Sequence, residues 1–402
     1  MGRRSTYYCW VAAVFCIVVG LYDIFYVIAQ NLPDRRIALA LRPVVDGPAV
    51  YPDFITPYAA VHAYFENKQS LIYDHARFSA FCSEFYAHRL DFNLRLFLYP
   101  PVWLLLLLPF GLLPVYAACT VFMVATAAAS AFASGRHLWS WVAVASSPAA
   151  VWTVLSGQNA FFYVALMYGG MRLLERSPVV AGIVLGILVY KPQICLLVPL
   201  ALLAARQWKA LASMITTGVS LVAVSLLVFG VDFWIDYLAM TRKLSEPPLF
   251  DLWTRDLAYF SISPFVAAYT LQLPNGIATA LQLGAAGLAA GAVWFAFRRH
   301  PSSAVRTAVL AAGTLLTSPY ALFYDLLLLM PAALTLYRQG ATKGFYPGEL
   351  LLYPVLWLMP TALFWFNTRF PIIPLVVLAL GFVAVVRLRG APGREASISC
   401  SG

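Results

Sequence analysis

The sequence predicts an all-α polytopic membrane protein with about twelve transmembrane helices. Of its 402 residues, 62% are hydrophobic and only 11% are charged, and apolar runs near the ~20 residues that cross a bilayer recur along the chain. The Lys and Arg residues behind the net charge of +10 lie mostly in short clusters between these runs, which is typical of cytoplasmic anchors. We therefore expect membrane lipids as partners and no nucleic acid.

The first predicted element is a signal anchor. Arg3 and Arg4 precede an apolar run from Tyr8 to Gln30, which is too long for the core of a cleaved signal peptide and lacks a small-x-small cleavage site. The N-terminus is then cytoplasmic. Cut at charges and at Pro, Gly and Asn, the predicted spans fall near residues 8–29, 115–134, 138–154, 158–175, 178–191, 193–206, 209–230, 276–297, 303–317, 320–338, 348–366 and 370–387.

Basic residues orient these spans. Tyr99 to Leu113 is apolar but only about fifteen residues long, so we expect a re-entrant or interfacial helix rather than a span. With that choice every inside junction is basic, as the positive-inside rule requires, and residues 388–402 form a cytoplasmic tail. The inside basic residues are Arg136, Arg172, Arg176, Arg206, Lys209, Arg298, Arg299, Arg306, Arg338, Lys343, Arg387, Arg389 and Arg394.

Two outward loops carry most of the acidic residues. The first, residues 31–114, is expected to hold juxtamembrane helices, and the second covers residues 231–275. Short polar turns at residues 157–159, 191–193 and 318–320 face the same side. Because broken backbone at membrane depth persists only inside the protein or along a cavity, we expect one membrane domain with a cavity that opens outward.

The cysteine and histidine patterns do not suggest a metal centre. Only Cys82 of the six cysteines lies in an outward loop, and the five histidines are scattered, so we expect neither a disulfide nor a structural metal site. The sequence also lacks a Gly-rich phosphate loop and a Gly-x-Ser-x-Gly motif in a plausible context.

Asp53 is the candidate catalytic residue. It lies between Pro52 and Pro57 in a segment rich in aromatic residues, and the two prolines stiffen the chain around it. A partly desolvated, rigidly held carboxylate can accept a proton from a hydroxyl within hydrogen-bond reach. The alternative is a carboxylate that caps a helix or pairs with a nearby arginine.

Three cations are candidates for binding a phosphate. Lys191 ends an apolar segment, where an ammonium costs roughly 2.5 to 3.5 kcal/mol unless it snorkels to the interface or meets an anion such as a lipid phosphate. Arg242 and Arg255 lie in the second outward loop among acids and aromatic residues. Simple anchoring in the headgroup layer is the alternative for both arginines.

Polar side chains at two further places are candidates for binding a sugar or its acceptor. Gln158 and Asn159 interrupt an apolar stretch, and their amides can bind sugar hydroxyls or cap a helix. Tyr320, Tyr324 and Asp325 lie near the start of a predicted span. An acid at that depth indicates function by default, although pairing with a loop arginine is the alternative.

Taken in chain order, these motifs resemble glycosyltransferase family 87 of the GT-C membrane superfamily. The resemblance implies a GT-C fold and an inverting hexosyltransferase, typically a mannosyltransferase, with a polyprenyl-phosphate sugar as donor and without nucleotide or obligatory metal. It places the active site on the periplasmic side of a bacterial cytoplasmic membrane. The motifs are Asp53-Phe54 with Tyr58, Tyr99-Pro100-Pro101, Gly157-Gln158-Asn159, Lys191-Pro192-Gln193, and Ser318-Pro319-Tyr320 with Tyr324-Asp325-Leu326.

The resemblance also implies roles for single residues. Asp53 would deprotonate a hydroxyl of a lipid or glycan acceptor, and Lys191, Arg242 or Arg255 would bind the donor phosphate. Relatives often carry His beside the last acid, where this chain has Tyr324, so no histidine role carries over. The residues expected to bind sugar or acceptor are Tyr58, Gln158, Asn159, Gln193, Tyr320, Tyr324 and Asp325.

Two other hypotheses stay open at this point. A transporter or lipid flippase can also have about twelve helices with both ends inside, but it usually has two similar halves and ionisable residues at the bilayer midplane. A structural subunit of a cell-envelope complex would neither transfer sugar nor bind polyprenyl phosphate.

Overall fold

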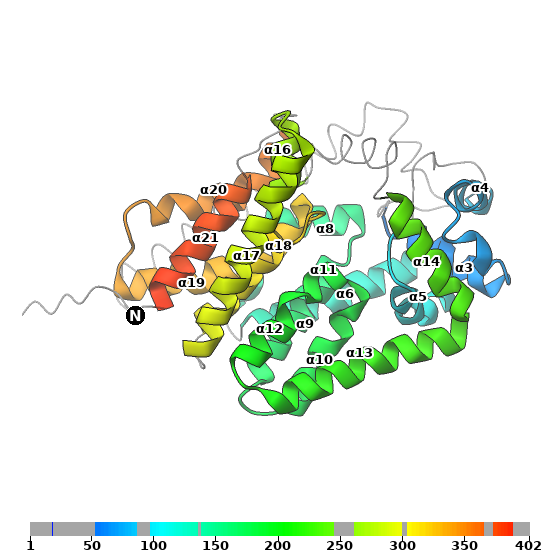
Figure 1. Cartoon of the computed structure of the whole chain (residues 1–402), viewed down its shortest axis with the longest axis horizontal. Helices are drawn as coiled ribbons and strands as arrows, with labels where there is room; N and C mark the ends of the chain where they lie inside the picture. The colour runs from blue at the N-terminus through cyan, green and yellow to red at the C-terminus, as the bar shows by residue number, and fades with distance from the viewer. Residues whose placement is uncertain are drawn as a thin grey trace, which may run out of the picture.

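The fold is all-helical in the part of the chain that the structure describes (Figure 1). A computed structural model describes residue 18 and residues 53–86, 97–135, 138–244, 261–299, 304–365 and 373–388. Extended pairing within these ranges is limited to an isolated antiparallel bridge between Ser261 and Leu322. The predicted fold class is confirmed at this level, while the predicted anchor at residues 8–29 lies almost entirely outside the described residues.

The described part of the chain is a succession of helices. In chain order they are α3 (Ile55–Phe65), η1 (Gln69–Leu71), α4 (His75–Phe85), α5 (Pro101–Leu107), η2 (Leu108–Leu112), α6 (Val115–Ser134), α7 (Leu138–Ala145), α8 (Pro148–Ser156), α9 (Ala160–Leu173), α10 (Pro178–Gly186), η3 (Ile187–Tyr190), α11 (Pro192–Cys195), α12 (Leu197–Ala204), α13 (Trp208–Phe229), α14 (Val231–Leu244), α16 (Pro264–Thr270), α17 (Asn275–Arg299), α18 (Ala304–Thr317), η4 (Phe323–Leu329), α19 (Met330–Lys343), α20 (Glu349–Trp365) and α21 (Ile373–Leu388).

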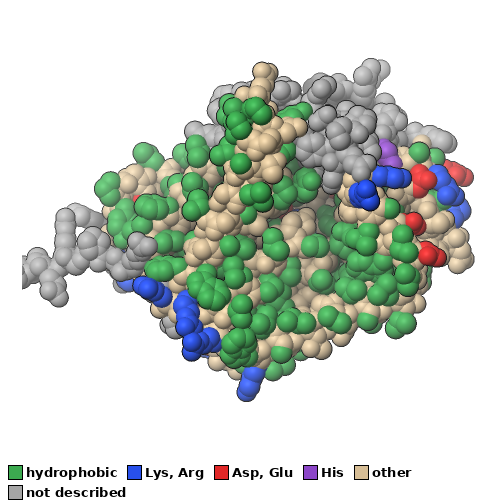
Figure 2. Space-filling view, in the orientation of Figure 1, with side chains coloured by type: hydrophobic (Ala, Val, Ile, Leu, Met, Phe, Trp, Pro, Cys, Tyr) green, Lys and Arg blue, Asp and Glu red, His purple; other side chains and the backbone are tan. Residues whose placement is uncertain are grey.

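Three described helices are long and apolar enough, by length and composition, to cross a membrane: α6, α13 and α17. Further apolar helices in the described ranges have 10–17 residues, and the segment Pro101–Leu112 is one of them. The count of about twelve spans and the re-entrant character of that segment stay predictions. Figure 2 shows apolar side chains spread over the face formed by α13 and α17, as expected for a surface in contact with lipid.

Several predicted spans are interrupted in the structure by prolines and by short 3₁₀ segments. Residues 138–154, for example, form α7 and α8, because Pro148 starts a new helix whose N-terminus is capped by the Ser147 side chain. Residues 320–338 likewise include η4 and α19, whereas the break after η3 and before α11 coincides with the predicted boundary between residues 178–191 and 193–206. These interruptions bring backbone turns and polar side chains to the ends of short helices.

Small residues allow α10 and α13 to pack closely. A Cβ added at Gly182 would meet the Ser213 side chain and the Ala210 backbone, and one at Gly186 would meet the Met214 backbone at 2.7 Å. A spacing of four residues between two glycines places both on one helix face, which is how membrane helices approach each other. The packed pair positions η3, which follows α10 directly.

Candidate functional site

Asp53 anchors a polar network at the start of α3. Its backbone N–H donates to the Ser156 carbonyl oxygen (2.8 Å), which joins the start of α3 to the end of α8. Its carboxylate Oδ2 accepts from the Gln158 amide Nε2 (2.8 Å). The Tyr99 hydroxyl donates to Gln158 Oε1 (3.4 Å) and accepts from the Asn159 amide Nδ2 (3.0 Å). The half-buried Asp53 carboxylate is thereby connected to two buried amides.

The turn between α8 and α9 positions these amides. Gly157 has a left-handed backbone (φ 73°) and ends α8, and the Gln158 N–H donates back to the Thr153 carbonyl (3.0 Å). Asn159 precedes α9, but its side chain makes no capping hydrogen bond. The amide of Asn159 therefore serves the network with Tyr99, and the helix-capping alternative does not describe it.

Lys191 and Asp325 form a buried ion pair. Lys191 Nζ lies 2.9 Å from Asp325 Oδ1, and their side chains are 7% and 3% exposed. The same oxygen accepts from the Tyr163 hydroxyl (2.6 Å), while Oδ2 accepts from the Leu322 N–H (2.8 Å). The ammonium also lies over the rings of Tyr163 (4.4 Å) and Tyr324 (5.9 Å).

This pair differs from the alternatives weighed for each residue alone. Lys191 is buried rather than snorkelled, and the partner of Asp325 is Lys191 rather than a loop arginine. Burial removes both charges from water, so each requires the other together with further hydrogen bonds.

Aromatic rings lie between the two polar groups. The Trp103 ring stacks on the Tyr190 ring (4.6 Å between centroids) and lies 5.5 Å from the Tyr99 ring. Burial raises the pKa of Tyr99 well above its ordinary value, and the negative charges of Asp53 and Asp325 raise it further against the opposing hydrogen bond from Asn159. Tyr99 is therefore a neutral hydroxyl in the field of both carboxylates.

Three buried polar atoms in this region have no hydrogen-bond partner. They are the side-chain oxygen Oδ1 of Asn159, the hydroxyl of Tyr190 and the indole Nε1 of Trp103; Asn159 is 3% exposed, Trp103 is 2% exposed and Tyr190 is fully buried. Buried polar atoms are nearly always paired with protein or water. Unpaired atoms beside a carboxylate network are suitable places for the hydroxyls of a polar ligand to bind.

The other predicted site residues make none of the hydrogen bonds described above. The Tyr58 hydroxyl donates to the Leu113 carbonyl (2.8 Å). Arg242 is exposed on α14, Gln193 is half-buried in α11, and Tyr320 is 39% exposed. Arg255 lies outside the described residues.

Four aromatic residues were not among the predicted site residues. Tyr99 belongs to the Tyr99-Pro100-Pro101 motif just before α5, and Trp103 follows it by four residues. Tyr163 could have been found because it lies four residues after Asn159, on the same face of α9. Tyr190 directly precedes Lys191, but no local signal shows that its ring stacks on Trp103.

Among the residues that the structure describes, no group of three or more His, Cys, Asp or Glu side chains is placed to hold a metal ion.

Comparison with known proteins gives one match. The model of glycosyltransferase family 87 matches residues 97–319, which is more than half of the 402 residues. The matched range includes Tyr99, the 157–159 turn and Lys191, whereas Asp53 and Asp325 lie outside it. No curated protein and no solved structure matches.

Proposed function

This chain belongs to glycosyltransferase family 87 and is a membrane glycosyltransferase, and we propose that it transfers a hexose, in the first instance mannose, from a polyprenyl-phosphate donor. The acceptor is a hydroxyl of a lipid or glycan. The family membership favours this enzyme over the transporter and structural-subunit hypotheses. The observation that carries the proposed chemistry is the Asp53 carboxylate, tied to Gln158 beside buried, unpaired polar atoms.

In this mechanism Asp53 is the general base. The acceptor oxygen attacks the anomeric carbon while Asp53 takes its proton, and the bond from that carbon to the phosphate oxygen breaks. The departing polyprenyl phosphate keeps the electron pair, and attack from the opposite face inverts the anomeric centre. The hydrogen bond from Gln158 Nε2 (2.8 Å) orients the carboxylate for this step.

Lys191 is the proposed cation for the departing phosphate. Its ammonium has three protons and donates to Asp325 at 2.9 Å, so further donors are available for phosphate oxygens. A fixed cation in a site shielded from water stabilises the charge that develops on the leaving group. Asp325, held by Tyr163 and the Leu322 N–H, acts on Lys191 as a positioning residue.

The sugar is proposed to bind at the unpaired atoms. Asn159 Oδ1 can accept from a sugar hydroxyl, and the Tyr190 hydroxyl can donate or accept. The Tyr58 hydroxyl is bonded to the Leu113 carbonyl and Tyr320 is 39% exposed, and we assign both residues to the approach of the acceptor. Arg242 and Arg255 stay proposed contacts of the donor headgroup in the second outward loop.

The proposal is tested by sugar transfer in a defined lipid bilayer. Purified protein in nanodiscs is incubated with a panel of radiolabelled polyprenyl-phosphate sugars and a membrane extract as the acceptor source. We expect one donor to be used, without added nucleotide sugar and in the presence of a metal chelator. Transfer that requires a nucleotide sugar, or none with any polyprenyl-phosphate sugar, would contradict the proposed donor.

Asp53→Asn tests the proposed role of Asp53 as the general base. We expect it to lower transfer by at least the 10²–10⁴-fold that general-base catalysis contributes, because the amide cannot take the proton. Glu84→Gln is the control, since Glu84 is an exposed acid on α4. Thermal unfolding in the same nanodiscs checks that both variants are folded, and full activity of Asp53→Asn would remove this residue from the mechanism.

A further inference from the structure

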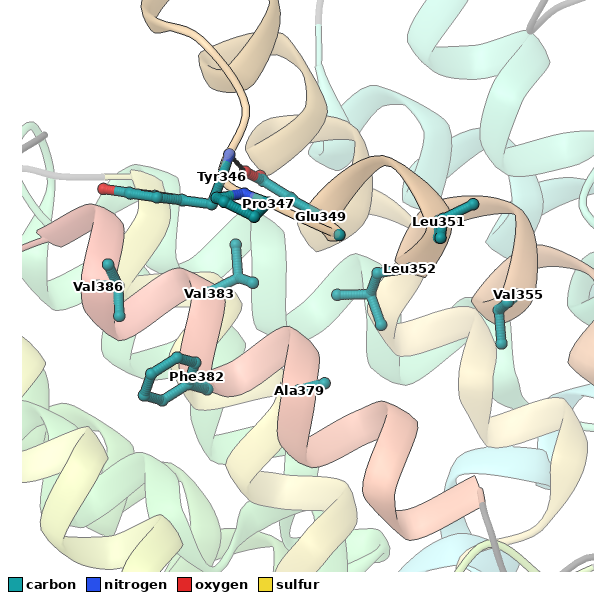
Figure 3. A pocket seen from close by; sticks show the side chains of 11 residues that line it. Tyr346, Pro347, Glu349, Leu351, Leu352, Val355, Ala379, Phe382, Val383 and Val386 are labelled. Atoms are coloured by element: carbon teal, nitrogen blue, oxygen red, sulfur yellow. Dashed lines mark hydrogen bonds between the residues drawn. The ribbon is translucent and has the colours of Figure 1, made fainter.

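A groove lies between α20 and α21 and shares no residue with the proposed active site (Figure 3). Its volume is about 630 Å³, which is within the range of ligand cavities. It runs from the turn before α20 along the facing sides of the two helices. The lining residues are Tyr346, Pro347, Gly348, Glu349, Leu351, Leu352, Val355, Ala379, Phe382, Val383 and Val386.

The walls of the groove are hydrocarbon. Leu351 on α20 and Phe382 on α21 are 71% and 68% exposed, and Leu352 and Val383 project between the two helices (Figure 3). In a membrane protein, an apolar surface of this kind is in contact with lipid tails rather than water. A groove with such walls fits a flexible acyl chain.

An ion pair closes the end of the groove at the turn before α20. Arg387 Nε donates to Glu349 Oε1 (2.8 Å), and the two side chains are 3% and 0% exposed. Glu349 also accepts from the Tyr346 N–H (2.8 Å) and the Tyr353 hydroxyl (2.6 Å). The carboxylate is fully used within the protein, so the pair ties the start of α20 to the end of α21 without offering a net charge to a ligand.

The residues beside this closed end carry an excess of positive charge. Lys343 is exposed at the end of α19, and the next residue, Gly344, accepts a hydrogen bond from Arg387 Nη2 (3.0 Å). Arg338 lies on the same helix, and Glu349 is the only acid in residues 338–355. An anionic headgroup therefore complements this end of the groove.

We propose that the groove between α20 and α21 binds an anionic glycerophospholipid. One acyl chain lies between Leu352 and Val383, and the phosphate lies beside Lys343. This site does not depend on the proposed sugar transfer, because it uses none of the residues of that reaction.

Photo-crosslinking tests where the acyl chain of the lipid binds. The protein is placed in nanodiscs of zwitterionic lipid that contain a small fraction of phosphatidylglycerol with a photoreactive acyl chain, and labelled peptides are mapped. We expect label at α20 and α21 to exceed label at the exposed face of α17 around Leu283 several-fold. Ala379→Trp, which fills the groove, should remove this excess, whereas Leu283→Trp, at a position 66% exposed, should not.

Lys343→Gln tests the headgroup without altering the core. Loss of one basic residue near a phosphate is expected to lower the labelling by phosphatidylglycerol about fivefold and to leave labelling by phosphatidylcholine unchanged, with Lys209→Gln as the exposed control. Equal labelling of the groove and α17, or no response to either variant, would overturn the proposal. So would crosslinks between two copies of the chain, or displacement of the label by polyprenyl phosphate at lower concentration than by phosphatidylglycerol.

Discussion

Asp325 balances the charge of the buried site. Its two carboxylate oxygens accept from Lys191, Tyr163 and the Leu322 N–H, so removing the acid leaves an ammonium that is 7% exposed without its anion. Breaking a buried pair from one side typically costs about 3–5 kcal/mol, whereas removing both charges costs much less. Comparing the loss of one charge with the loss of both therefore distinguishes a structural role of the Lys191–Asp325 pair from a functional one.

We therefore predict different outcomes for single and double variants. Asp325→Asn and Lys191→Met should each lower the free energy of unfolding by about 3–5 kcal/mol, and the double variant should regain most of that stability. All three should lose sugar transfer, because Lys191 is either absent or no longer held in place by Asp325, and the departing phosphate then lacks a fixed cation. The measurements are denaturation midpoints and transfer rates, with Lys209→Met as the control. Wild-type transfer by the double variant would show that the pair is only structural.

A second prediction concerns His62 on α3. Burial lowers the pKa of His62 below its ordinary value of 6.5, and Glu66 opposes this shift. At a pH below about 6.5 the folded state therefore binds fewer protons than the unfolded state. The contribution of His62 to the free energy of unfolding is present in full above about pH 6.5 and is lost as the pH falls through the lower pKa of the folded state. Thermal midpoints should fall more steeply for wild type than for His62→Phe from about pH 7 to about pH 5. Parallel curves would contradict this assignment.

The contact between α10 and α13 depends on glycine. A side chain at Gly182 would meet backbone as well as Ser213, so the helices would have to separate, whereas nothing lies within 4 Å of a Cβ at Gly284 on α17. We predict that Gly182→Ala lowers the thermal midpoint, since overpacking typically costs about 1–3 kcal/mol. Gly284→Ala should leave it unchanged or raise it, because alanine favours a helix. Equal effects of the two substitutions would contradict close packing as the reason for Gly182.

Most of the polar residues of the site lie where helices are interrupted rather than along the faces of continuous helices. Asp53 precedes α3, Gln158 and Asn159 join α8 to α9, Lys191 follows η3, and Asp325 lies in η4. Proline and glycine at these points made the turns predictable, since both residues end or restart helices. The 3₁₀ character of η3 and η4 was not predictable, because the apolar residues around them are equally compatible with a continuous helix.

Charge is distributed unevenly over the visible face of the described residues. On the face that Figure 2 shows, Lys and Arg without neighbouring acids lie where α17 ends and α13 begins, whereas most of the Asp and Glu lie on the opposite side near α3 and α14, together with further Lys and Arg. This distribution agrees with the basic junctions used to orient the chain. The side of the membrane on which each edge lies remains part of the proposal.

Cysteine labelling tests that orientation. In a chain whose natural cysteines are replaced by alanine, Glu84→Cys should react with a membrane-impermeant maleimide on intact spheroplasts. Lys343→Cys should react only after lysis, because its helix end is predicted to be cytoplasmic. Both positions are exposed, so accessibility within the protein does not limit either reaction. The opposite pattern would place the proposed active site in the cytoplasm.

The sequence by itself determined the helical membrane class, some of the places where helices break and the family, because apolar run length, proline, glycine and short motifs are local properties. It also indicated Asp53, Gln158, Asn159, Lys191 and Asp325 as separate candidates. Only the tertiary structure decided that Lys191 pairs with Asp325, 134 positions away, and that Glu349 pairs with Arg387. The partner of a buried charge depends on which distant helices pack together, and that packing cannot be predicted from the spacing of residues along the chain.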